Sequence, residues 1–178
     1  MKNNLVAYPL NEFYAMAEMP LPAIEAVSGE QVPEPQKTLL VHENDMTPTL
    51  QKFYNYRIDL ELKKKVLNGR FFMREVVLLE RRRRPVVFGA IRIHLEMFPE
   101  AVRQKILECR RPLGEILSDH QIPHRSHPDA FFRMVPDEII KDALQLHDDR
   151  ALYGRVNRLL DPQGEPLVEV VEILPPGA

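Results

Sequence analysis

A run of apolar, β-prone residues, 69–79, constrains the fold of this chain more than any other feature. An Asn68-Gly69 pair precedes the run and four arginines follow it, while Arg74 and Glu75 stand side by side in its middle. Neighbouring residues on a strand point to opposite faces, so one of these two charges is expected to face a core. A buried charge needs an ionic partner or a ligand, because leaving it bare costs several kcal/mol.

The segments on either side of this run predict further strands joined by short turns. Residues 56–66 alternate apolar and charged side chains, and Asn68-Gly69 is a strong signal for a hairpin turn. Strands are expected at residues 56–66, 70–80, 86–95, 151–160 and 166–174, and helices at residues 47–54, 99–109 and 136–146. Successive strands with short turns form an antiparallel meander. The order of elements therefore predicts an α+β fold, with one antiparallel sheet and helices on one side.

Length and composition suit one domain: the chain has 178 residues, of which 44% are hydrophobic and 28% charged. We divide it into a proline-rich N-terminal extension, residues 1–37, which is expected to follow the surface, and a domain, residues 38–178. A net charge of −2 gives no reason to expect nucleic acid or an anionic membrane as a partner. The chain begins without the apolar core of a signal peptide and has no apolar run of ~20 residues, which predicts a cytoplasmic protein without a membrane span.

Three conspicuous features carry weak functional signals. Residues 81–84 are all arginine, but they lie at a predicted hairpin tip without interleaved aromatic residues, which favours a solvated turn over a phosphate-binding patch. Three histidines fall within the loop or strand at residues 120–135, where Pro123 and Pro128 exclude a continuous helix, so a mobile polar loop is favoured over a metal site. Cys109 adjoins two arginines that favour a reactive thiolate, yet a half-buried structural cysteine fits its predicted helix better.

Charges embedded in the apolar strands are the remaining candidates. Arg74 shares a strand face with Phe72 and Val76, and on the closing strand Glu172 lies between Val170 and Leu174. Glu169 and Arg92 are embedded in the same way. One interpretation is a set of cross-strand salt bridges on a solvated face. The other is an enclosed pocket in which an arginine binds a carboxylate and a glutamate donates a proton. Alternation alone does not decide between them.

Several separated segments resemble the chorismate pyruvate-lyase family. They occur in that family's order between about residues 39 and 176, each one short: Asp45-Met46-Thr47, Phe72-Met73-Arg74-Glu75-Val76-Val77-Leu78, Pro112-Leu113-Gly114, Leu152-Tyr153-Gly154-Arg155-Val156-Asn157-Arg158-Leu159, Gly164-Glu165-Pro166-Leu167 and Glu172-Ile173-Leu174-Pro175. The resemblance implies a six-stranded antiparallel sheet with helices packed on one side and an internal ligand pocket under flaps. It also implies that chorismate is cleaved to pyruvate and 4-hydroxybenzoate, or a close hydroxybenzoate, without a cofactor or a metal.

The resemblance also assigns site residues. Arg74 would bind the substrate carboxylate, Glu172 would protonate the leaving group, and Met46 and Leu113 would contact the ring. Arg92 is a weaker candidate for the second carboxylate. One extra residue between Pro166 and Glu172 makes Glu169 a rival for the acid role.

Other departures from the family keep alternative functions open. The stretch at residues 120–135 belongs to an insertion of roughly fifteen residues that would act as a lid or block the pocket, and the tryptophan of the Leu-Trp-Gly-Arg motif is Tyr153 here. The alternative function is a non-catalytic module for a small aromatic acid, because the same fold is similar to the effector-binding domains of some bacterial transcription regulators. A third is an interaction protein that uses residues 81–84 as a contact patch. The sequence does not specify the oligomeric state.

Overall fold

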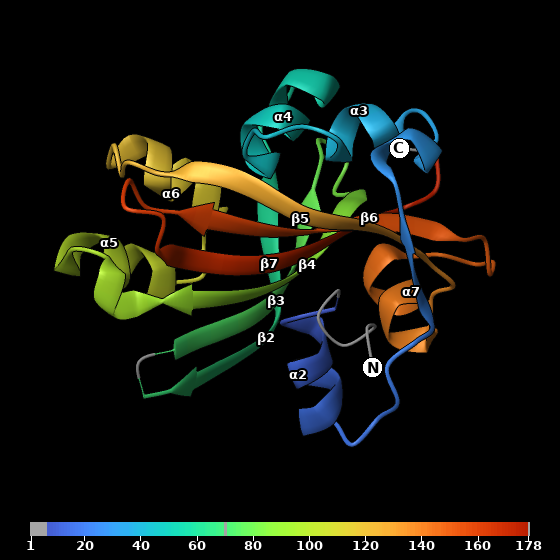
Figure 1. Cartoon of the computed structure of the whole chain (residues 1–178), viewed down its shortest axis with the longest axis horizontal. Helices are drawn as coiled ribbons and strands as arrows, with labels where there is room; N and C mark the ends of the chain where they lie inside the picture. Colours follow the sequence, from blue (N-terminus) through green and yellow to red (C-terminus); the bar gives the residue numbers. More distant parts are fainter. Residues whose placement is uncertain (1–6, 70, 178) are drawn as a thin grey trace.

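The computed structural model describes residues 7–69 and 71–177, so Arg70, which the sequence analysis placed in a strand, lies outside the described residues. The described chain forms one antiparallel sheet in the order β1-β5-β6-β7-β4-β3-β2 (Figure 1). The strands are β1 Ile24–Val27, β2 Asp59–Asn68, β3 Phe71–Leu79, β4 Pro85–His94, β5 Arg125–Met134, β6 Leu152–Leu160 and β7 Pro166–Leu174. The predicted α+β class with a single antiparallel sheet is confirmed, with seven strands where six were expected.

The additional strand comes from the proline-rich N-terminal segment. β1 pairs with residues 131–134 of β5, the strand formed by the histidine-containing stretch. Pro128 fits within β5 because the register shifts between Pro128 and Ala130, and because β1 leaves that part of the strand unpaired on one side. The histidine-containing stretch, expected as a mobile polar loop, is therefore largely a strand of the sheet.

Helices cover both faces of the sheet. They are α2 Leu10–Met16, α3 Gln36–Leu40, α4 Met46–Tyr54, α5 Glu100–Leu107, α6 Leu113–Asp119 and α7 Glu138–Leu144, with short 3₁₀ turns at Gly29–Gln31 and Leu95–Met97. Figure 1 shows α5 and α6 at one end of the sheet and α2 and α7 towards the other. No helix in residues 7–69 or 71–177 is long and apolar enough to cross a membrane.

The second helical layer differs from the one-sided packing that the sequence predicted. α5 and α6 pack on the face that carries Val76, Ile91 and Val170. α2 and α7 pack on the opposite face, which is also apolar, against a cluster that includes Val77, Leu79, Phe88, Ala90, Val171 and Ile173. Because β3, β4 and β7 are apolar on both faces, each face requires a cover.

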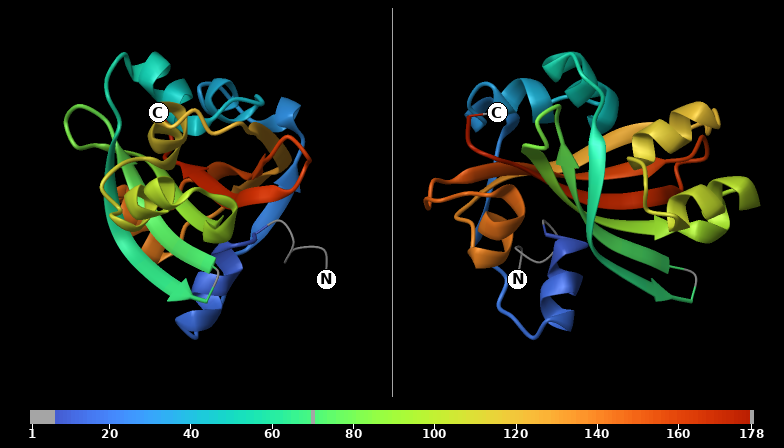
Figure 2. Two further views of the ribbon diagram at one scale, coloured as in Figure 1. Left: turned by 90° about the vertical axis from the view of Figure 1, so that its left-hand side faces the viewer. Right: turned by 180° about the vertical axis from the view of Figure 1, so that it is seen from behind.

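Part of the N-terminal segment belongs to this second layer. Leu10, Phe13 and Tyr14 of α2 are at most 3% exposed and join the same core cluster as Ile24 of β1. Figure 2 shows the segment passing from α2 along the curved sheet to β1 and on to α3. The division at residue 37 stays a prediction, although the segment from residue 7 onward contributes buried side chains to the core.

Gly154, in β6, lies where β5 and β7 both approach closely. A Cβ atom there would stand 2.5 Å from the backbone oxygen of Glu172 and would overlap the ring of Phe132. We expect Gly154→Ala to lower the free energy of unfolding by about 1–3 kcal/mol, because the neighbouring backbone cannot move aside without breaking strand pairs. Urea unfolding measures this change.

The matched control is Gly89→Ala in β4. Its Cβ would meet a methyl group of Val76 at 3.3 Å, and a side-chain methyl can shift by a few tenths of an ångström. We therefore expect Gly89→Ala to change the unfolding free energy less than Gly154→Ala does. Equal effects of the two substitutions would contradict the close approach at Gly154.

Candidate ligand-binding site

A pocket lies between the sheet and the first turns of α4 and α6. Its empty volume is about 610 Å³, including the space at its open mouth. Most lining side chains are aliphatic, and a few polar ones converge among them, as is usual for small-molecule sites. The lining residues are Asp45, Met46, Thr47, Leu60, Arg74, Val76, Leu78, Val87, Gly89, Ile91, Pro112, Leu113, Gly114, Asn157, Leu159, Val168, Val170 and Glu172.

Sheet register brings Arg74 and Glu172 to the same pocket. Arg74 is paired with Ile91 of β4, and Gly89 of the same strand is paired with Glu172 of β7. Two strand spacings and a two-residue offset separate the two Cα atoms by about 12 Å. Gly89, which has no side chain, lies on the pocket floor beside Glu172. The space between the two charged residues is therefore open to a ligand.

Arg74 is a buried cation without an ionic partner in the described structure, and the Cys109 thiol is a polar group beside it. Its side chain is 0% exposed, and Nε, Nη1 and Nη2 have no hydrogen-bond acceptor among the described residues. Burial lowers the pKa of Arg74, and the neighbouring Cys109 acts in the opposite direction. An arginine nevertheless stays charged in proteins. The unpaired guanidinium is therefore the strongest indication of what the pocket binds.

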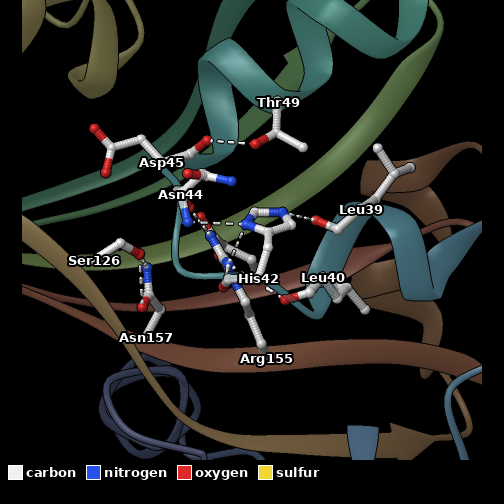
Figure 3. Close-up of polar contacts among 10 residues, drawn as sticks. Leu39, Leu40, His42, Asn44, Asp45, Thr49, Ser126, Arg155 and Asn157 are labelled. Atoms are coloured by element: carbon white, nitrogen blue, oxygen red, sulfur yellow. Dashed lines mark hydrogen bonds and ion pairs between the residues drawn. The ribbon is translucent and has the colours of Figure 1, made fainter. Parts of the chain in front are cut away.

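Glu172 is paired with a second buried arginine. Arg155 of β6 is 0% exposed and donates from Nε to Oε2 of Glu172 at 2.5 Å. Its Nη atoms donate to the backbone oxygens of Leu40, His42 and Asn44 at 3.1–3.3 Å (Figure 3). Arg155 is fully committed to these acceptors, so it adds no free positive charge to the pocket.

Asp45, at the start of α4, is also paired. Its Oδ2 lies 2.7 Å from Nε2 of His124, and this hydrogen bond is the main cause of the raised pKa of His124. α4 begins two residues before Pro48, earlier than the sequence predicted, and the Asp45 carboxylate binds the histidine instead of capping the helix. The described residues contain no group of three His, Cys, Asp or Glu side chains placed to hold a metal ion.

The predicted ring contacts also line the pocket. Met46 is in the first turn of α4 and Leu113 in the first turn of α6, and both are buried. Gly114 allows the two helices to approach, because a Cβ atom there would stand 3.2 Å from the Thr47 side chain. The structure thus brings together Arg74, Glu172, Met46 and Leu113.

Arg92 and Glu169 lie outside this pocket. The guanidinium carbon of Arg92 lies 3.5 Å from the centre of the Phe71 ring, and Nη1 of Arg92 donates to the hydroxyl of Tyr8. Glu169 accepts a hydrogen bond from His94 at 2.8 Å. Both are on the opposite face from Arg74 and Glu172, because they sit at odd offsets from the pocket-facing residues of their strands. The position of Arg92 does not support the predicted contact with a second carboxylate.

Arg155 and Gly89 are site residues that the sequence analysis did not single out. Arg155 lies in the Leu-Tyr-Gly-Arg segment, embedded in a strand as Arg74 is, and alternation places it on the opposite face from Arg158 without saying which of the two is buried. Gly89 interrupts an otherwise apolar strand, a signal that often marks close approach or open space.

Glu75, adjacent to Arg74, points to the opposite face. It is 8% exposed in the layer beneath α2, where Asp137 and Tyr14 interact with it and no arginine pairs with it among the described residues. Burial raises the pKa of Glu75, Lys64 opposes this effect, and Asp137 adds to it. The folded state therefore binds this proton more tightly than the unfolded chain does.

A pH dependence of stability follows from this shift. A raised folded-state pKa contributes stability that is complete below about pH 4.5 and is lost as the pH rises through the folded-state pKa. We expect Glu75→Gln to raise the melting temperature at pH 8 and to lose this advantage towards pH 4.5, as measured by calorimetry across that range. Glu61→Gln on the exposed edge strand is the control, because Lys63 lowers the pKa of Glu61. If Glu75→Gln raised the melting temperature by the same amount at every pH, this result would contradict a raised pKa of Glu75 in the folded state.

Comparison with known proteins supports the fold alone. No family model matches the sequence, and no curated protein matches it. Among solved structures, PhnF from Mycobacterium smegmatis is similar at 11% identity with a TM-score of 0.59, covering 76% of this chain and 65% of that one. YydK from Bacillus subtilis, described as a possible transcriptional regulator, is similar at 7% identity and a TM-score of 0.57, covering 93% of this chain and 75% of that one.

A third similar structure is a ligand-binding domain assigned to a GntR-family transcriptional regulator from Bordetella bronchiseptica. It is 11% identical with a TM-score of 0.52, and the alignment covers 68% of this chain and 87% of that one. Identities this low carry no information about ligand or activity. The chain shares its fold with ligand-binding domains of GntR-type regulators.

Proposed function

We propose that this chain is a binding module for a small monocarboxylate with an apolar or aromatic body. The unpaired, buried guanidinium of Arg74 carries this proposal. A carboxylate matches the planar fork of an arginine and would satisfy donors that otherwise remain unpaired. The aliphatic lining of the pocket suits the rest of such a ligand. The shared fold with regulator ligand-binding domains agrees with a binding role.

The charge balance of the pocket favours one carboxylate over two. The described lining contains three charged side chains: Arg74, Asp45 and Glu172. Asp45 is paired with His124, and Glu172 with Arg155. One positive charge is left, so a second ligand carboxylate would be buried beside two acidic residues without a cation of its own.

Calorimetric titration with matched ligands tests the proposal; a tryptophan probe is not an option in a chain that has none. We expect benzoate to bind, benzamide to bind at least about 30-fold more weakly because a charge-assisted contact contributes about 2 kcal/mol, and terephthalate to bind more weakly than benzoate. Equal affinity for benzoate and benzamide would contradict the role of Arg74.

Chorismate lyase activity is a second candidate. The observation in its favour is that Arg74 and Glu172, the pair implied by the resemblance to chorismate pyruvate-lyases, line one pocket together with Met46 and Leu113. Two features weigh against it. Chorismate carries two carboxylates, and Glu172, which would have to donate the proton, already accepts a hydrogen bond from Nε of Arg155.

Incubation with chorismate separates the two candidates. Under the binding-module proposal, no pyruvate above the uncatalysed background is expected, while benzoate still binds. Pyruvate release by the wild-type protein that disappears in both Arg74→Met and Glu172→Gln would establish the lyase instead. Arg92→Met is the control for these substitutions, because Arg92 lies on the other face and its loss should leave ligand affinity unchanged.

A further inference from the structure

Arg155 connects the pocket to a loop at the surface. From β6 its guanidinium binds Glu172 of β7 on one side. On the other side it binds three backbone oxygens of residues 40–44 (Figure 3). This single side chain therefore joins the floor of the pocket to the segment between α3 and α4. It does so from a position with no exposure to solvent.

The segment that Arg155 binds, residues 41–45, has few other fixed contacts. It forms neither helix nor strand, and Glu43 and Asn44 are exposed. Within it, Nε2 of His42 bonds to the Leu39 oxygen at 2.8 Å and Nδ1 accepts from the Asn44 amide at 3.1 Å. Burial and the nearby Arg155 lower the pKa of His42, so the ring is neutral in this arrangement. Val41 packs against a core cluster, and Thr49 Oγ1 donates to the Asp45 backbone oxygen. The hydrogen bonds of Arg155 and His124 connect the segment to β6 and to the start of β5.

The same segment forms part of the pocket wall. Asp45, its last residue, lines the pocket together with Met46 and Thr47, with which α4 begins. A change in how Arg155 holds residues 41–45 would therefore move the entrance to α4. Loops held by few contacts open locally with small free energies, so one added or lost hydrogen bond changes their order measurably.

Glu172 has one carboxylate oxygen bound to Arg155 and also lines the pocket. A ligand hydroxyl that donates to the other oxygen would fix the carboxylate, and with it the Arg155 guanidinium. We propose that Arg155 is a positioning residue through which a hydrogen bond between ligand and Glu172 orders residues 41–45. The order of this surface loop then depends on which ligand occupies the pocket. This inference rests on the proposed binding function. It adds that ligands with a hydrogen-bond donor for Glu172 increase the order of residues 41–45, and that ligands without one do not.

Two ligands that differ by one hydroxyl test the coupling. In the full chain, saturating 4-hydroxybenzoate is expected to slow amide hydrogen exchange of residues 41–49 by at least about 5-fold, because an added bond to a charged group shifts local opening by that order. Benzoate, bound at Arg74 alone, is expected to change this exchange by less than about 2-fold. The contrast between the ligands is a readout that a purely structural Arg155 would not produce.

Glu172→Gln is the matched variant, because its amide oxygen can still accept from Arg155 while its NH₂ group cannot accept from a hydroxyl. In this variant 4-hydroxybenzoate should lose its advantage over benzoate in slowing exchange, and its affinity should fall about 10-fold below its wild-type value. Equal slowing by both ligands, or slowing retained in Glu172→Gln, would overturn the coupling while leaving the carboxylate site intact. If neither ligand binds the wild-type chain, the proposed function fails and this inference fails with it.

Discussion

Replacing Arg74 with methionine is expected to weaken carboxylate binding by at least about 10-fold and at the same time to stabilise the empty protein. The guanidinium is fully buried and has no acceptor among the described residues, so the ligand-free fold bears its desolvation cost. Methionine fills a similar volume without a charge. We expect the free energy of unfolding to rise by about 1–4 kcal/mol, the range seen when buried ionic groups are replaced by apolar ones.

The expected loss of ligand affinity follows from the contact between the Arg74 guanidinium and the ligand carboxylate. A charge-assisted, two-pronged bond from arginine to a carboxylate contributes about 1.5–3 kcal/mol, so benzoate affinity should fall by at least about 10-fold in Arg74→Met. Urea unfolding without ligand measures the free energy of unfolding, and calorimetric titration with benzoate measures the affinity. Arg74→Lys separates charge from shape, because lysine keeps the charge and loses the planar fork. A less stable Arg74→Met protein would mean that the guanidinium has a partner in the folded state.

The opposite outcome is expected for Arg155, the other fully buried arginine. Arg155→Met should destabilise the protein by about 3–5 kcal/mol, because it leaves Glu172 as an uncompensated buried carboxylate. It also removes the donor for three backbone oxygens. Arg155→Lys should recover only part of this loss, because one ammonium group cannot replace a fork that reaches four acceptors.

Arg158 provides the control on the same strand. It faces the other side of β6 and binds Asp129 through Nε and Nη2, with its side chain 38% exposed. A surface pair of this kind contributes about 0–1 kcal/mol, so Arg158→Met should change the urea midpoint little. If Arg155→Met and Arg158→Met destabilise equally, the network around Arg155 does not stabilise the fold as we describe.

The sequence predicted the parts of the fold that depend on local periodicity. The central strands follow from two-residue alternation, which also places Glu172 and Glu169 on opposite faces of β7 but does not say which face carries the pocket. It could not predict β1, a four-residue strand whose only sheet partner lies about a hundred residues later. Nor could it assign α2 to a face, because the central strands are apolar on both sides and either face would accept a helix.

The site was predictable to the same extent. Arg74, Glu172, Arg92 and Glu169 were candidates because each is a charge embedded in an apolar strand. The resemblance selected Arg74 and Glu172 and added Met46 and Leu113, and these four line one pocket. Arg155 was missed because β6 carries two arginines, and nothing in a single sequence says that one is 0% exposed while the other faces solvent. Whether a buried arginine is available to a ligand depends on its ionic and hydrogen-bond partners, and these partners come from segments far apart in the chain.

The central position of β7 determines when the pocket can form. β2, β3 and β4 form one hairpin-connected meander that ends in β4, while β6 and β7 form another hairpin. Only the pairing of β7 with β4 joins the two, and this pairing places Glu172 and Arg155 within reach of the ligand site at Arg74. During synthesis this edge of β4 therefore stays unpaired until residues 166–174 have left the ribosome, and the binding site cannot form before that point.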